Sequence, residues 1–164
     1  MIRLFLFSAG GLAALAGLVF AAGALHSPDF RAQASIEIAR PSQQVYDFLT
    51  NAENLPKWSP EIEKVVKLSD QPLRFAVSSR GASNVVEYFD LEPPRTFASR
   101  TSLPEMGVGG TWRIRIEPSA AGCQVSSTVE MKIESIRWRA IAQFMDASGE
   151  ELRTLTALKQ YLEK

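Results

Sequence analysis

The section of chain from residue 35 to 66 constrains the fold more than any other. Residues 35–39 alternate between apolar and polar side chains, which is typical of a half-buried strand. Pro41 suits the first turn of a helix, and the apolar side chains among residues 45–49 recur three and four positions apart, as on one helix face. A second short helix follows, which Pro56 ends. The order strand, helix, short helix predicts a compact unit that leads into a sheet.

A corner at Trp58, Ser59 and Pro60 opens a series of strands bounded by turn residues. The strands that follow residue 112 are the clearest, because their apolar and polar side chains alternate without interruption. Such alternation predicts an antiparallel sheet with one covered face and one wet face. We predict strands at residues 34–39, 61–68, 73–79, 84–91, 96–103, 112–117 and 123–133.

The C-terminal segment is predicted to cover that sheet. Apolar residues recur three and four positions apart from Trp138 to Leu162, which indicates one amphipathic helix of about 25 residues. Its middle, Ala147, Ser148 and Gly149, is small and weakens a helix. A long helix with a weak centre lying across a curved sheet leaves room beneath it, so we expect a cavity there.

Composition excludes several classes of function. The 18 basic and 18 acidic side chains balance, so no cationic surplus exists for nucleic acid. Cys123 is the single cysteine, which rules out an internal disulfide and a cysteine-rich metal site. His26 is the single histidine and precedes the predicted domain, so a histidine base is excluded from it. We expect neither a metal nor another cofactor.

Residues 1–25 form a segment of their own. No charged side chain occurs from residue 4 to 25, and Arg3 precedes the run. The run is long enough to cross a bilayer, which favours a transmembrane anchor, whereas Ala22, Gly23 and Ala24 resemble a signal-peptide cleavage site. Both interpretations place the rest of the chain outside the cytoplasm, either anchored at the membrane or released. We therefore divide the chain into this segment, a linker at 26–33 and a domain at 34–164.

The order of elements resembles the START-like (Bet v 1-like, helix-grip) superfamily, and more narrowly the bacterial polyketide cyclase/dehydrase (SRPBCC) proteins. The resemblance covers residues 34–164. It implies an α+β fold in which a seven-stranded antiparallel sheet wraps around a long C-terminal helix and an apolar pocket. Members bind lipids, sterols or polyketides, and some catalyse cyclisation, so the fold alone does not choose an activity. The matching positions are Ile36, Ile38, Pro41, Val45, Tyr46, Phe48, Leu49, Trp58, Ser59 and Pro60, with the Tyr88 to Pro94 stretch.

Inward-facing strand residues and the helix residues opposite them are the pocket candidates. The competing interpretation is a fully packed core without a void, and Trp58 is more readily explained as core than as a ligand contact. The predicted pocket residues are Phe75, Val77, Ser79, Tyr88, Trp112, Ile114, Val125, Ser127, Val129, Ile141, Phe144, Met145 and Ser148.

Three functions stay open. The first is a domain that binds a hydrophobic small molecule or lipid without covalent chemistry. The second is a cyclase or dehydratase, for which Tyr88 and Glu87 are the candidate proton-transfer groups. Glu87 can transfer a proton to a ligand only if its side chain points into the pocket. The simpler expectation is that Glu87 lies on the solvated face of its strand. The third is an interaction module with a solid core and an exposed apolar patch.

Overall fold

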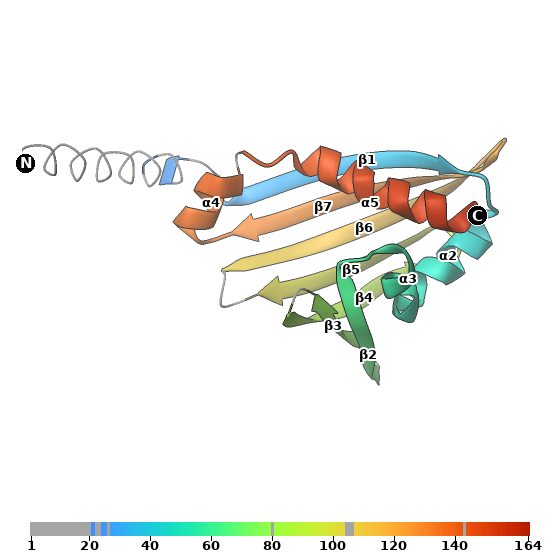
Figure 1. Cartoon of the computed structure of the whole chain (residues 1–164), viewed down its shortest axis with the longest axis horizontal. Helices are drawn as coiled ribbons and strands as arrows, with labels where there is room; N and C mark the ends of the chain where they lie inside the picture. The colour runs from blue at the N-terminus through green and yellow to red at the C-terminus, as the bar shows by residue number, and fades with distance from the viewer. Residues whose placement is uncertain (1–20, 22–23, 26, 80, 104–106, 143) are drawn as a thin grey trace, which may run out of the picture.

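The computed structural model describes residues 21, 24–25, 27–79, 81–103, 107–142 and 144–164. It shows one curved sheet, with helices gathered along its inner face and at one end (Figure 1). In chain order the elements are β1 (Asp29–Ile38), α2 (Ser42–Thr50), the 3-10 helix η1 (Ala52–Asn54), α3 (Leu55–Trp58), β2 (Ile62–Asp70), β3 (Leu73–Ser79), β4 (Ala82–Glu92), β5 (Thr96–Leu103), β6 (Val108–Ser119), β7 (Gly122–Ile133), α4 (Ile136–Ala142) and α5 (Ala147–Leu162).

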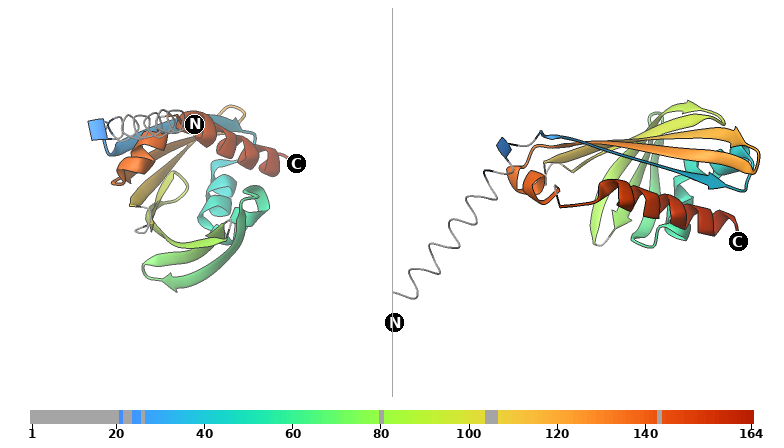
Figure 2. Two further views of the ribbon diagram at one scale, coloured as in Figure 1. Left: turned by 60° about the vertical axis from the view of Figure 1, so that its left-hand side comes forward. Right: turned by 90° about the horizontal axis from the view of Figure 1, so that it is seen from above.

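The sheet is antiparallel throughout, with the order β1-β7-β6-β5-β4-β3-β2. Strands β2 to β7 follow one another by hairpins, and β1 then pairs with β7, so β1 and β2 form the two edges. Figure 2 shows the curvature of the sheet from two further sides. The predicted α+β helix-grip fold, a seven-stranded antiparallel sheet with a C-terminal helix against it, is confirmed.

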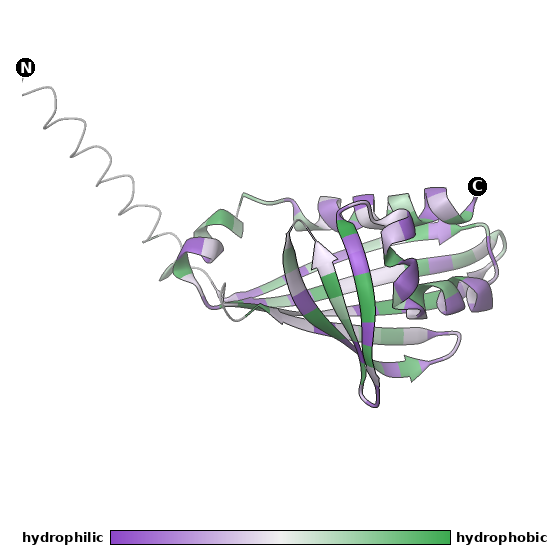
Figure 3. Ribbon diagram, turned by 60° about the horizontal axis from the view of Figure 1, so that its bottom comes forward, coloured by the Kyte–Doolittle hydropathy of each residue, from purple (hydrophilic) through white to green (hydrophobic). Residues whose placement is uncertain are grey.

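One face of the sheet is covered, as the alternation predicts. Along β7, Cys123, Val125 and Val129 are buried while Gln124 and Glu130 are exposed. Figure 3 shows the same alternation of hydrophobic and hydrophilic residues along the strands. The buried side chains of the sheet meet those of α2 and α5 in one apolar core.

Helix α5 lies along β1, the edge strand of the sheet. Its Lys159 Nζ donates a hydrogen bond to the Glu37 carbonyl oxygen over 2.7 Å, and its last turn is tied to the end of β1 by the Ala39 amide, which donates to Glu163 Oε1 over 2.7 Å. Leu155 and Leu158 are the buried residues of the helix. Because α5 is held toward this edge, the space on its other side opens toward β2 to β5.

The single long C-terminal helix predicted from residue 138 to 162 is wrong. The structure has two helices, α4 and α5, separated by residues 143–146. The Asp146 side chain accepts a hydrogen bond from the Gly149 amide over 3.0 Å and so caps the start of α5. The small residues 147–149, predicted as a weak helix centre, therefore form the first turn of a new helix.

Two boundaries also differ from prediction. Strand β1 begins at Asp29 and pairs with β7 along its whole length, so residues 29–33 belong to the sheet and the predicted linker at 26–33 is too long. Pro56 lies in the first turn of α3, where a missing amide hydrogen costs nothing, and does not end the second helix.

The predicted anchor or signal segment at residues 1–25 lies outside the described residues, apart from Ala21, Ala24 and Leu25. Within the described part of the chain, no helix has both the length and the apolar character to cross a membrane.

Candidate ligand-binding cavity

A cavity of about 400 Å³ lies between the inner face of the sheet and α5. Strands β3 to β6 form one wall of the cavity, and α5 forms the opposite wall. Helices α2 and α3 and the start of β2 close one end of it. The lining residues are Leu49, Leu55, Trp58, Ser59, Glu61, Ile62, Val77, Ser79, Asn84, Val86, Tyr88, Phe97, Ser99, Thr101, Trp112, Ile114, Glu151, Thr154, Leu155 and Leu158. The cavity is therefore walled mostly by apolar and aromatic side chains, with polar groups at a few places.

Stacked aromatic rings hold the sheet side of the cavity in place. The Tyr88 ring stacks on Phe97 with centroids 5.7 Å apart, and Phe75 packs against Tyr88 at 5.4 Å in an edge arrangement. Tyr46 from α2 meets the Phe97 ring edge-on at 6.0 Å. Aromatic pairs of this kind contribute about 0.5–1.5 kcal/mol each beyond the area they bury. The rings that face the cavity are thus fixed by neighbours behind them.

Tyr88 is a buried tyrosine that lines the cavity. The residue is 6% exposed, and burial raises the pKa of its phenol to about 12. The Tyr88 hydroxyl forms no hydrogen bond with another described residue. Two other polar side chains of the cavity are already paired, because Asn84 donates to Thr101 Oγ1 over 2.9 Å and the Thr101 hydroxyl donates to the Val85 carbonyl oxygen. The neutral Tyr88 hydroxyl is therefore available to a ligand as a hydrogen-bond donor.

Two carboxylates lie at the wall formed by the helices. Glu61 follows α3 and accepts a hydrogen bond from the Ser59 hydroxyl, and Glu151 projects from the first turns of α5. Among the described residues that line the cavity, none is a lysine, arginine or histidine. The charge at the wall is thus negative, which disfavours an anionic ligand group there.

Only part of the predicted pocket lies at the cavity. Val77, Ser79, Tyr88, Trp112 and Ile114 line it. The predicted residues of β3 and β7 that are buried but do not line the cavity are Phe75, Val125, Ser127 and Val129. The predicted residues from the C-terminal segment are exposed and outside the cavity, because they lie in α4, in the connection after it and in the first turn of α5: Ile141, Phe144, Met145 and Ser148.

Several lining residues were missed. Val86 and Phe97 share the inward phase of their strands with predicted neighbours, so the alternation pattern contained that signal. Leu155 belongs to the apolar stripe predicted for the C-terminal segment but was not assigned to the pocket, and Leu158 was not singled out. The contribution of Leu49 and Leu55 from α2 and α3 depends on how those helices fold back on the sheet, for which the sequence carries no local signal.

Glu87 lies on the other face of the sheet from the cavity. Its carboxylate pairs with Arg74 Nε at 2.8 Å and with Arg100 on the neighbouring strands. The hydrogen bond from Arg74, assisted by Arg100, lowers the pKa of Glu87 below its usual value. The carboxylate is thus an outer-face ion pair and does not point into the cavity.

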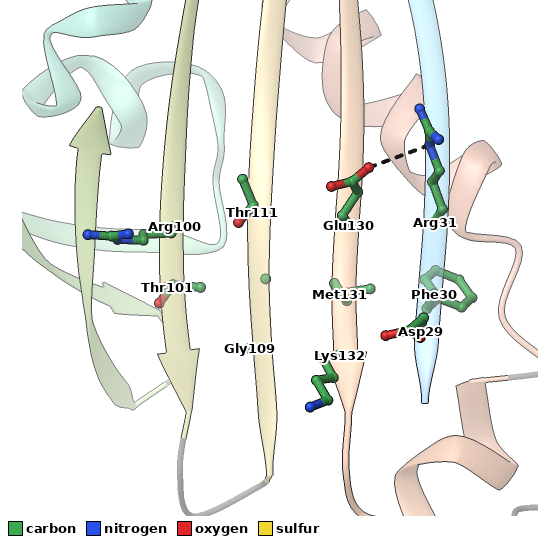
Figure 4. Close-up of a pocket in the computed structure, with 11 residues that line it drawn as sticks. Asp29, Phe30, Arg31, Arg100, Thr101, Gly109, Thr111, Glu130, Met131 and Lys132 are labelled. Atoms are coloured by element: carbon green, nitrogen blue, oxygen red, sulfur yellow. Dashed lines mark ion pairs between the residues drawn. The ribbon is translucent and has the colours of Figure 1, made fainter. Parts of the chain in front are cut away.

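A second hollow lies on the outer face of the sheet near the ends of β1, β6 and β7 (Figure 4). It is crossed by the ion pair between Arg31 and Glu130, whose atoms are 3.9 Å apart, and it is flanked by Arg100 and Lys132. None of the helices in the described part of the chain covers this face, so a ligand there stays largely in water. The covered inner cavity is therefore the better candidate for holding an apolar molecule.

No group of His, Cys, Asp or Glu side chains in the described part of the chain is arranged to hold a metal ion. The lone thiol, Cys123, is fully buried, and burial raises its pKa. A raised pKa keeps the thiol protonated and unreactive.

A curved antiparallel sheet closed over an internal cavity by a C-terminal helix defines a helix-grip domain of the START-like class. The chain belongs to the family described as "Polyketide cyclase / dehydrase and lipid transport", whose model matches residues 29–163. The match begins where β1 begins and ends in the last turn of α5. The domain and the family match thus coincide.

Solved structures show the same fold. The di-domain ARO/CYC StfQ of the steffimycin biosynthetic pathway is 15% identical, with a TM-score of 0.66 over 82% of this chain, and the match spans 51% of StfQ, about half its length. An uncharacterised protein from Bacillus thuringiensis is 16% identical, with a TM-score of 0.65, 82% of this chain and 100% of that protein covered.

Norcoclaurine synthase from Thalictrum flavum, solved with dopamine and hydroxybenzaldehyde, is 12% identical, with a TM-score of 0.62, 82% of this chain and 87% of the synthase covered. A comparison with curated protein sequences finds no match. Identities this low establish the fold and leave the activity to the chemistry of the cavity.

Proposed function

We propose that this domain binds a hydrophobic small molecule or lipid, without covalent chemistry, in the cavity between the sheet and α5. The observation that carries the proposal is the cavity itself: about 400 Å³, partly open to solvent and lined mainly by apolar and aromatic side chains. Ligand sites are typically about 300–1,000 Å³, mostly apolar, with a few placed polar groups. The interaction-module hypothesis assumed a solid core, and the cavity removes that assumption.

The polar groups of the cavity narrow the ligand's chemistry. The Tyr88 hydroxyl donates to an acceptor oxygen on the ligand, and the carboxylates of Glu61 and Glu151 repel an anion. A ligand with an uncharged polar end, such as a hydroxyl or carbonyl group, suits this lining better than a carboxylate. The chemistry thus favours a neutral amphiphile over a fatty acid anion.

The proposal includes a setting. The uncharged run at residues 4–25 supports an anchor that holds the domain against a membrane, outside the cytoplasm. A signal peptide cleaved near Ala24 is the alternative, and it also exports the domain. An apolar ligand is then taken from, or delivered to, the bilayer next to the domain.

A cyclase or dehydratase activity is the second candidate. It is supported by the enzymes among the structural neighbours and by Tyr88, which can donate a proton to a bound substrate. It lacks a partner base on the sheet side, because Glu87 lies on the outer face. Binding therefore accounts for the cavity with fewer assumptions.

A matched pair of serine substitutions on β5 tests the proposal. Ser99 lines the cavity, whereas Ser102 is exposed. Ser99→Phe fills the cavity and Ser102→Phe adds the same ring to the surface. We measure binding of decanol and decanoate to each full-length protein by calorimetry and native mass spectrometry.

We expect the parent and Ser102→Phe to bind decanol with equal affinity, and Ser99→Phe to bind it at least tenfold more weakly. We also expect the parent to bind decanoate more weakly than decanol. Equal decanol affinity in both variants places the ligand elsewhere and refutes the proposal. Absence of any alcohol or lipid binding by the parent also refutes it.

A further inference from the structure

Large apolar side chains are exposed together at α4 and the residues that follow it. Phe144 is 90% exposed, Met145 58%, Ile141 47% and Trp138 39%. We call these four residues the α4 surface. Single exposed apolar residues are ordinary, but four within eight positions of chain are a local concentration, and exposed apolar patches mark contact with a partner or a membrane.

The α4 surface lies where the chain enters the domain. The Ile133 amide donates a hydrogen bond to the Pro28 carbonyl oxygen over 2.8 Å, and Asp29 pairs with Lys132 at the start of β1. Helix α4 begins three positions after Ile133, at the same end of the sheet (Figures 1 and 2). The N-terminal apolar run therefore ends beside the α4 surface.

The distance between the two is short. From residue 25, the end of the uncharged run, to the first residue of β1 the chain spans at most about 14 Å when fully extended. Leu25 itself is 85% exposed. A run that crosses a bilayer and ends there holds this end of the domain within a short reach of the bilayer surface.

The composition of the segment fits a bilayer interface. The sequence IRWRAIAQFM, residues 136–145, carries two arginines and no acidic residue. Trp138 and Ile141 lie three positions apart on α4, Arg137 and Arg139 flank Trp138, and Arg139 Nη2 donates to the Glu134 carbonyl oxygen over 2.9 Å. Tryptophan and arginine beside aliphatic residues are typical of helices that lie in the interface of a membrane.

We propose that the α4 surface docks on the lipid bilayer and sets the orientation of the domain on it. The proposal rests on the membrane anchoring proposed above, and it adds a second contact that the anchor alone does not supply. Residues 143–146 join α4 directly to α5, the helix that covers the cavity. Docking through α4 thus brings the covering helix of the cavity close to the lipid from which a ligand comes.

A fluorescent probe on the α4 surface tests the proposal in the full-length protein. Phe144→Cys places a thiol at the most exposed residue of the surface, and Leu68→Cys places one on β2, the opposite edge of the sheet from β1, at a residue that is 53% exposed. Cys123 is fully buried and does not compete for the label. Each variant is labelled with the polarity-sensitive dye NBD and mixed with or reconstituted into vesicles of phosphatidylcholine and phosphatidylglycerol.

We expect the emission of the residue-144 probe to shift to shorter wavelength with vesicles and to become shielded from aqueous iodide, while the residue-68 probe changes in neither respect. A residue-144 probe that stays water-exposed in protein resisting carbonate extraction overturns docking and leaves the anchor standing. A shielded residue-144 probe in protein that carbonate extracts supports docking and overturns the anchor. A water-exposed probe in extractable protein overturns both.

Discussion

Removing the Tyr88 hydroxyl should change how the stability of the protein depends on alkaline pH. Tyr88 lines the cavity, is 6% exposed, and has a phenol pKa raised from 10.0 to about 12 by burial. The raised pKa means that the folded state holds the proton more tightly than the unfolded state. This contribution is fully present below pH 10 and is lost as the pH rises through 12.

The size of the effect follows from the shift. Two pKa units correspond to about 3 kcal/mol of unfolding free energy, lost between pH 10 and 12. At pH 11, midway through the window, about 1 kcal/mol should already be lost. In Tyr88→Phe no phenol is buried at this position, so this part of the alkaline loss should disappear.

The assay is urea unfolding at several pH values between 8 and 11. We expect the unfolding free energy of the parent to fall more steeply above pH 10 than that of Tyr88→Phe. Tyr161→Phe is the matched control, because the Tyr161 ring is half-buried and stacks on Phe48, so it should follow the parent. Parallel curves for the parent and Tyr88→Phe would show that the phenol is hydrated in the folded state, and would refute the assignment of Tyr88 as a buried group with a raised pKa.

Three further substitutions test the sheet that supports the cavity. Glu87→Gln removes the ion pairs that lower the Glu87 pKa. A lowered pKa stabilises the folded state above the unfolded value of 4.5, and this stabilisation is lost as the pH falls, so the unfolding temperature of the parent should drop more between pH 6 and 3 than that of the variant. Identical pH profiles of the unfolding temperature contradict the assignment of Glu87 to these ion pairs. Gly122→Ala should destabilise by about 3 kcal/mol or more in urea unfolding, because the glycine has φ +150° and a Cβ there meets the Ile38 carbonyl oxygen at 2.3 Å. Gly81→Ala, at φ +77° in open space, should cost only about 1–2 kcal/mol, and equal losses at the two glycines refute the steric argument.

The alternation of side chains predicts which face of the sheet is covered but not which part of that face borders the cavity. Tyr88 and Val125 both point inward, yet only Tyr88 lines the cavity. The difference comes from α5, which Lys159 and Glu163 tie to β1 through backbone groups. Such long-range hydrogen bonds decide where a helix lies, and they leave no periodic trace in the sequence.

The break in the C-terminal helix shows a different limit. The apolar spacing from Trp138 to Leu162 continues across the break, so periodicity alone predicts one helix. The signal that competes with it is Asp146, which caps a helix start when three small residues follow. The cap and the apolar stripe gave opposite indications, and the structure follows the cap, which pairs an amide group that the start of a helix otherwise leaves without an intrahelical partner.

The positions of the ionisable groups favour binding over catalysis. A proton transfer inside the cavity needs a group that gives a proton and another that takes one. Tyr88 stays protonated at neutral pH and can only give, whereas Glu87 faces away and is held ionised by its arginine partners. The carboxylates of Glu61 and Glu151 lie on the helix side, with Glu61 bound to the Ser59 hydroxyl. A bound amphiphile needs only the Tyr88 donor for its polar end and the apolar walls for its body, so binding requires no proton acceptor in the cavity.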